Sequence, residues 1–117
     1  MAITPVVIAD DDDVAITVTA KKVDSEGDSG YVVSITNRTS GKVYAYSDVG
    51  WSVKDADVDD AVLRAVVDSG QTVEEFVWFD HRDLSISSLD GLEDVEGAIV
   101  IEDFDTAAII GEYAFKV

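Results

Sequence analysis

The chain has 117 residues, of which 25 are acidic and eight are lysine or arginine, so its formal net charge is −17 at pH 7. A chain of this length forms a single domain, residues 1–117, and a second independent core is excluded. Its hydrophobic content of 47% is too high for an acidic disordered tail, because that much apolar surface can offset the entropy lost on folding.

The negative charge argues against two classes of partner. An acidic surface repels the phosphates of nucleic acids and the headgroups of anionic membranes, so we expect neither nucleic-acid binding nor membrane insertion. No uncharged run approaches the length of a membrane span. The first residues, Met1–Pro5, lack the basic and apolar regions of a signal peptide, so an exported form would have lost its signal segment.

The composition favours strands and excludes cysteine chemistry. The chain has 19 Val and 9 Ile against 4 Leu, and β-branched side chains suit a pleated surface. The 18 Asp and 7 Glu agree, because short carboxylates favour turns over helices. The absence of cysteine removes disulfides, thiolate catalysis and cysteine-ligated metal sites.

Period-two alternation predicts most strands in the first half of the chain. An entry strand, Val6–Ala9, ends at the acidic run Asp10–Asp13. The next strands present alternating apolar residues, first Val14, Ile16, Val18 and Ala20, then Tyr31, Val33 and Ile35. The turn Arg38–Gly41 leads into a strand, Lys42–Tyr46, so we expect a hairpin across Tyr31–Tyr46.

The following segments are less uniform. Val49, Trp51 and Val53 alternate and are predicted to face the core. Ala61–Val67 fits either one helical turn or a buried strand. Val73–Phe79 is apolar on both faces, which indicates a central strand or a face covered by a partner, and a second copy covering it would give a homodimer.

The last third contains a loop with a short helical turn in Leu84–Val95 and a strand at Ala98–Ile101. The final strand carries Tyr113, Phe115 and Val117 on one side. In total the pattern predicts an all-β fold, an antiparallel β-sandwich of seven or eight short strands with one short helical turn.

The single histidine is one candidate for chemistry. His81 lies between Asp80 and Asp83, carboxylates that would raise its pKa and orient it as a general base or metal ligand. No motif places a nucleophile beside it, so we interpret it as a solvated loop residue and expect no catalytic residues.

Three acidic clusters, Asp10–Asp13, Asp24–Asp28 and Asp55–Asp60, offer the oxygen ligands that calcium prefers. The spacing of an EF-hand fails in both of the longer loops. An irregular calcium site at the end of a sandwich needs no fixed spacing, and Asp55, Asp57 and Asp59 are then the first choice. The alternative is a solvated acidic surface without a metal.

The aromatic residues allow two interpretations. Trp51 and Trp78 would stack on a sugar if exposed, but their apolar neighbours place them in the core. Tyr44 and Tyr46 share one face of a strand, and either a core edge or an exposed contact surface fits them. Asn37–Thr39 matches the glycosylation sequon.

Several segments together resemble an immunoglobulin-like β-sandwich domain of secreted or lipoprotein-anchored proteins of Gram-positive bacteria, including gut actinobacteria. These segments are Asp12–Val14, Gly30–Asn37, Lys42–Tyr44, Asp48–Val53, Val67–Gln71 and Val95–Ile101. The resemblance implies a location outside the cell or at its surface. It also implies a tight turn after Val53, where this chain has Lys54–Asp55 in place of the usual Asn–Gly.

We therefore expect a non-enzymatic extracellular or cell-surface interaction module with a protein or glycan partner. A calcium-stabilised adhesion module or a carbohydrate-binding module is the alternative, and a hydrolase is a lesser one. Two further interpretations of the acidity are adaptation to high salt and mimicry of DNA by rows of carboxylates.

Overall fold

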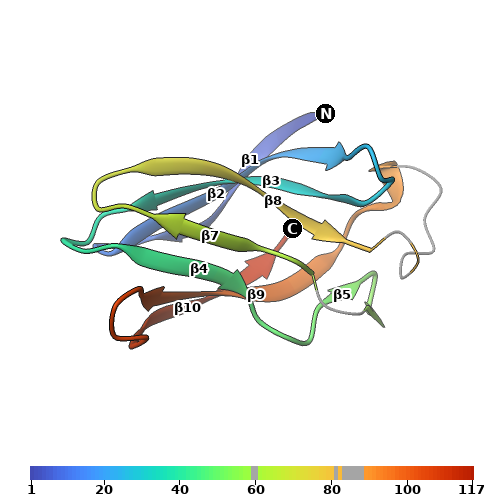
Figure 1. Ribbon diagram of the computed structural model, residues 1–117. Coiled ribbons are helices and arrows are strands. Elements are labelled where there is room, and N and C mark those ends of the chain that lie inside the picture. Colours follow the sequence, from blue (N-terminus) through green and yellow to red (C-terminus); the bar gives the residue numbers. More distant parts are fainter. Residues whose placement is uncertain (59–60, 81, 83–88) are drawn as a thin grey trace.

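The computed structural model describes residues 1–58, 61–80, 82 and 89–117, and it shows two antiparallel sheets packed face to face (Figure 1). The smaller sheet has the order β1-β2-β3-β8, and the larger has the order β6-β5-β9-β4-β7 with β10 paired to β9. The strands are β1 (Ala2–Asp10), β2 (Val14–Val23), β3 (Ser29–Asn37), β4 (Val43–Ser47), β5 (Ser52–Val53), β6 (Ala56–Asp57), β7 (Arg64–Val67), β8 (Thr72–Phe79), β9 (Val95–Asp103) and β10 (Ile109–Lys116).

The predicted all-β antiparallel sandwich is confirmed. Eight of the described strands have four residues or more, and β5 and β6 have two each. The one described helical element is the three-residue 3-10 turn Leu89–Gly91, inside the loop where a helical turn was predicted. No helix in the described part of the chain has the length and hydropathy needed to cross a bilayer.

Alternation along the strands builds the core between the sheets. In β2 and β3 the predicted apolar series are fully buried except for Ala20, which is half-buried after a register shift that follows Val18. Register pairs Ile16 with Ile35 and Val18 with Val33. β9 and β10 contribute Ile99, Ile101 and Phe115 from the opposite sheet. Side chains at the intervening positions of these strands point outward, because successive residues of a strand face opposite sides.

Four aromatic rings join the two sheets at the centre of this core. Trp51 packs against Phe115 with ring centroids 4.9 Å apart and against Phe79 at 5.9 Å, and Phe115 also meets Tyr31 at 5.6 Å. The indole N–H of Trp51 donates to the carbonyl of Asp48 at 2.7 Å. The prediction that Trp51 lies in the core is therefore confirmed.

The predicted hairpin across Tyr31–Tyr46 is wrong. β3 pairs with β2 and β8 in the smaller sheet, whereas β4 pairs with β7 and β9 in the larger one. The turn after Asn37 therefore crosses from one sheet to the other (Figure 1). A tight turn looks the same in a sequence whether it reverses a strand within one sheet or passes between two.

Asn37 holds this crossing together. Its side chain is fully buried, its amide nitrogen donates to the carbonyls of Gly41 and Val67, and its oxygen accepts from the backbone and hydroxyl of Thr39. Every polar atom of the side chain is thus bonded within the fold. The sequon at Asn37 is not accessible for glycosylation in the folded protein.

The ambiguous segment Ala61–Val67 is extended. Its C-terminal part is β7. Val62 forms an isolated β-bridge with Trp78, in which the N–H of Val62 donates to the carbonyl of Trp78 at 2.8 Å and the N–H of Trp78 donates to the carbonyl of Val62 at 3.1 Å. β7 consequently runs between β4 and β8 and joins the two sheets along one side (Figure 1).

The interpretation of Val73–Phe79 as a central strand is wrong, because β8 lies at the edge of the smaller sheet. Val77 and Phe79 are buried in the core, so Phe76 and Trp78 face outward and are only half-buried. Trp78 is therefore not the core residue that its apolar neighbours indicated. The alternative, a partner on this face, remains a prediction.

Two smaller findings concern the segment after β4. Val49 is 73% exposed rather than core-facing, because the chain leaves β4 before reaching it. The implied tight turn after Val53 is present: β5 and β6 form a hairpin in which both Lys54 and Asp55 have positive φ. Two positive φ values in a two-residue loop match the twist of the flanking strands, which explains why Asn–Gly is favoured at such turns.

Asn37→Asp is expected to destabilise the protein by about 2 to 4 kcal/mol, because it places an oxygen against the carbonyls of Gly41 and Val67, which now receive N–H donors. Urea denaturation measures this change. Ser40→Ala, at an exposed position of the same turn, is the control and should change the free energy of unfolding by less than about 0.5 kcal/mol. Equal effects of the two substitutions would contradict the role given to Asn37.

Gly97→Ala is expected to cost about 1 to 3 kcal/mol, because a Cβ at this position would overlap the indole ring of Trp51. The nearest heavy atom to a Cβ on Gly41 lies 3.9 Å away, so Gly41→Ala is the matched control. Thermal unfolding of both variants tests whether the Trp51 ring needs this close approach. A Gly97→Ala variant as stable as Gly41→Ala would show that it does not.

Candidate functional site

The outer face of the larger sheet carries two adjacent cross-strand rows of side chains. Strand register aligns the first row as Glu112, Val100, Tyr46 and Arg64 across β10, β9, β4 and β7. The second row is Ile109, Glu102, Tyr44 and Val66 in the same order. The register therefore gathers on one surface side chains that are far apart in the chain.

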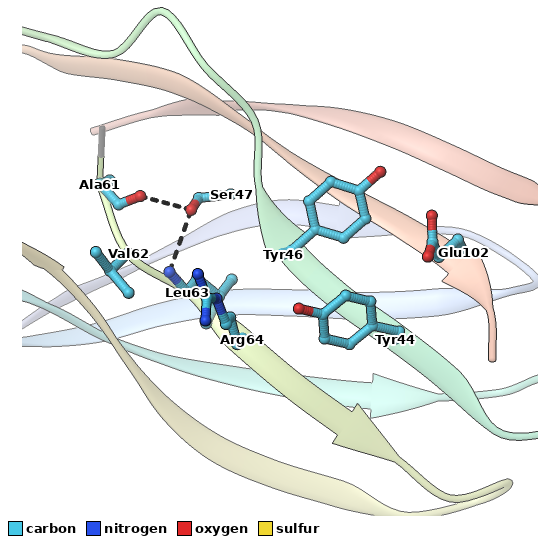
Figure 2. Close-up of a pocket in the computed structure, with 8 residues that line it drawn as sticks. All are labelled: Tyr44, Tyr46, Ser47, Ala61, Val62, Leu63, Arg64 and Glu102. Atoms are coloured by element: carbon cyan, nitrogen blue, oxygen red, sulfur yellow. Dashed lines mark hydrogen bonds between the residues drawn. The ribbon is translucent and has the colours of Figure 1, made fainter. Parts of the chain in front are cut away.

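The two tyrosines form the centre of this surface. Tyr44 and Tyr46 are successive outward residues of β4, and their rings stack at 5.3 Å with an angle of 30°. They line an open hollow of about 550 Å³ together with Ser47, Ala61, Val62, Leu63, Arg64 and Glu102 (Figure 2). The sequence left open whether this pair was a core edge or a contact surface, and it is an outward-facing, half-buried pair.

Exposed aliphatic and aromatic side chains extend the tyrosine surface. Val66 is 48% exposed and Ile109 is 59% exposed, and both lie in the row of Tyr44. Phe104 follows at the end of β9, 48% exposed, with the Lys42 ammonium 5.2 Å from its ring centroid. An outward face this rich in tyrosine and apolar residues is typical of a contact surface.

Three carboxylates contribute to a raised pKa of Tyr46. Partial burial raises the pKa most, and the charges of Glu102, Asp48 and Glu112 raise it further. A side-chain hydrogen bond with Asp48 and the charge of Asp48 raise the pKa of Glu112. The Tyr46 end of the surface is therefore strongly electronegative.

Ser47 supplies the aliphatic hydroxyl among the residues that line the hollow, and its hydrogen bonds stabilise the fold. Its Oγ donates to the carbonyl of Ala61 at 2.6 Å and accepts from the backbone N–H of Leu63 at 3.1 Å (Figure 2). A serine nucleophile needs a base that accepts its proton, and here a backbone carbonyl accepts it. The hollow is chemically equipped for stacking, hydrogen bonding and ion pairing.

The predicted site residues lie elsewhere or outside the described residues. Asp55 and Asp57 are exposed in the β5–β6 hairpin, and Asp59 lies outside the described residues. His81 and Asp83 likewise lie outside them. Calcium binding by Asp55, Asp57 and Asp59 stays a prediction.

A different acidic group comes together in the β2–β3 loop. Among the residues that the structure describes, Asp24, Glu26 and Asp28 are the only three acids whose carboxylate oxygens lie within 4.8 Å of one another. Asp24 Oδ1 accepts the backbone N–H groups of Glu26 and Asp28 at 2.9 and 3.0 Å. This capping arrangement is a local reason for the cluster, because an aspartate commonly closes a loop in this way.

The sequence pattern showed Tyr44 and Tyr46 but not their neighbours. Arg64, Glu102 and Glu112 come from three other strands, and only the strand register brings them to β4.

Comparisons of the chain with protein-family models, with curated proteins and with solved structures found no match.

Glu112→Gln is expected to raise the thermal midpoint at about pH 7 and to leave it unchanged at about pH 4. The pKa of Glu112 is raised in the folded state, so its contribution to stability is present below its unfolded value and is lost as the pH rises through the folded value. The glutamine removes the repulsion by Asp48 that appears at the higher pH.

Glu74→Gln is the control for this measurement, because Glu74 is an exposed acid on β8 and its loss changes the net charge by the same amount. Differential scanning fluorimetry over the pH range gives both curves. A stabilisation by Glu112→Gln that is the same at both pH values, or that Glu74→Gln reproduces, would contradict the coupling of Glu112 to Asp48.

Proposed function

We propose that this protein is a non-enzymatic interaction module, extracellular or at the cell surface, that binds a protein partner through the outer face of its larger sheet. The observation that carries the proposal is the stacked pair Tyr44 and Tyr46, which lies in an open hollow on that face. Tyrosine supplies a large contact area with few rotatable bonds, which is why it is enriched where proteins bind one another.

The surroundings of the pair favour a protein over a glycan. Arg64 and Glu102 would suit the hydroxyl groups of a sugar stacked on the tyrosines. The surface continues, however, into the aliphatic side chains of Val66 and Ile109. Sugar hydroxyls lose hydrogen bonds against aliphatic carbon, whereas apolar side chains of a protein gain from being buried there.

The location outside the cell belongs to the same proposal. It is supported by the resemblance of the strand pattern to domains of secreted and lipoprotein-anchored proteins. The acidic surface is compatible with it, because a large net charge keeps an exposed domain soluble and directs it toward cationic partners.

The double variant Tyr44→Ala/Tyr46→Ala tests the surface. Random peptides displayed on phage serve as the probe. They are selected for binding to the wild-type protein and counter-selected on the double variant, which has the same net charge. We expect selected peptides to bind the wild-type protein at least about tenfold more tightly than the variant, as measured by fluorescence anisotropy.

The control is Phe76→Ala/Trp78→Ala, a pair of aromatic residues with the same spacing on the outer face of the smaller sheet. It should leave peptide affinity unchanged while both double variants retain the circular dichroism of the wild-type fold. Loss of binding in the control alone would assign the contact surface to β8 instead. Failure to obtain any peptide that distinguishes the wild type from the tyrosine variant would overturn the proposed function.

A further inference from the structure

The outer face of the larger sheet around Tyr44 and Tyr46 is called the tyrosine face below. Its charges are distributed unequally between its β10 end and its β7 end. Across the row of Tyr46, Glu112 lies at the β10 end and Arg64 at the β7 end. Glu102 lines the hollow beside Tyr46, and Asp48 raises the pKa of Glu112. The β9–β10 side of Tyr46 therefore carries Glu102 and Glu112, Asp48 follows the end of β4, and the β7 side carries one cation, Arg64.

Within the described residues Arg64 forms no ion pair. Most of the other cationic side chains form an ion pair with a nearby acid. These pairs are Arg38 with Asp10, Lys42 with Asp68, Lys54 with Glu93, Arg82 with Asp80 and Lys116 with Glu96. In a chain with three times as many acids as cations, an arginine left without a carboxylate beside a binding hollow has donors available for a ligand.

We infer that the partner segment presents a lysine or arginine side chain, which docks against the ring of Tyr46 between Glu102 and the pair Asp48 and Glu112. This inference rests on the proposed function and names the chemistry of the partner. The cation takes its place over the tyrosine ring, and an acceptor of the same segment, a carboxylate or a backbone carbonyl, meets Arg64.

Charge complementarity favours a cationic side chain on the partner, both at long range and at short range. At long range the net charge of −17 attracts a basic partner and raises its rate of association. At short range a cation relieves the repulsion between Asp48 and Glu112 and gains from the electron-rich face of the tyrosine ring. Neither gain is available to a neutral segment.

The same charges argue against a second copy of this chain as the occupant. Another copy would bring a further net charge of −17 against a face that is already electronegative at the β10 end. Arg64 alone does not balance the three acids around Tyr46. A partner with basic side chains satisfies both the acids and the overall charge.

Peptides that distinguish the wild type from Tyr44→Ala/Tyr46→Ala are the probe for this inference. In each peptide every lysine is replaced by norleucine and every arginine by citrulline, one position at a time, so that only the positive charge is lost. We expect one such replacement to weaken binding at least about threefold, as fluorescence anisotropy measures it.

The location of the cation follows from combining peptide and protein changes. In Asp48→Asn/Glu112→Gln, the same replacement should have a smaller effect, because the acids that receive the cation are neutral. In Glu74→Gln/Glu75→Gln, which removes two charges from β8, the replacement should keep its full effect. Arg64→Gln should weaken binding of the unmodified peptide without changing the effect of the replacement.

Three results would overturn the inference while leaving the proposed function intact. These are peptides without a basic residue, peptides whose neutral replacements bind as well as the originals, and an undiminished replacement effect in Asp48→Asn/Glu112→Gln. Displacement of the peptides by neutral disaccharides, or dimerisation of the protein through the tyrosine face in light scattering, would also overturn it. The absence of any peptide that needs Tyr44 and Tyr46 would instead refute the proposed function itself.

Discussion

The packing of Trp51 between the two sheets is the contact on which the rest of the structure depends. Its ring lies over Gly97 of the larger sheet and meets Phe79 of the smaller one, and Phe115 completes the cluster. Large aromatic side chains bury more surface than any others, so a few of them dominate the free energy of a small core. Without cysteine, the chain has no covalent link between its sheets, and this cluster is the centre of the non-covalent one.

The same residue also connects the core to the tyrosine face. The indole N–H bonds the carbonyl of Asp48, and the N–H of Asp48 bonds the carbonyl of Ala98, at 2.7 and 2.9 Å. Asp48 follows β4 directly, and its charge raises the pKa of both Glu112 and Tyr46. The backbone of Asp48, at the electronegative end of the tyrosine face, is therefore fixed by a buried side chain on the opposite side of the sheet.

The many aspartates of this chain serve at least two purposes. Several close turns: Asp11, Asp24 and Asp103 each accept two backbone N–H groups through Oδ1, and those bonds lower the pKa of Asp11 and Asp103. Asp11 also accepts the Tyr113 hydroxyl at 2.7 Å, which ties the β1–β2 turn to β10. Asp48 instead raises the pKa of Glu112, and perturbed pKa values of this kind are enriched where ligands bind.

The sequence by itself determined most of the strands, most of their buried faces and the class of fold. Series such as Val14, Ile16 and Val18 specify which side of a strand is buried, because the period of two is a local property of an extended chain. The same periodicity placed Tyr44 and Tyr46 on one face. It was misleading for Val73–Phe79, where apolar residues on both sides indicated a central strand and the fold has an edge.

Only the tertiary structure decided which strands are neighbours. It separated β3 from β4, buried the amide of Asn37 in the crossing between them, and aligned Glu112 and Arg64 with Tyr46. Pairing between distant strands depends on the packing of the whole core and on the path of each turn, and local patterns carry little information about either. The individual tyrosines were therefore visible in the sequence, whereas the charged surface around them exists only in the assembled sheet.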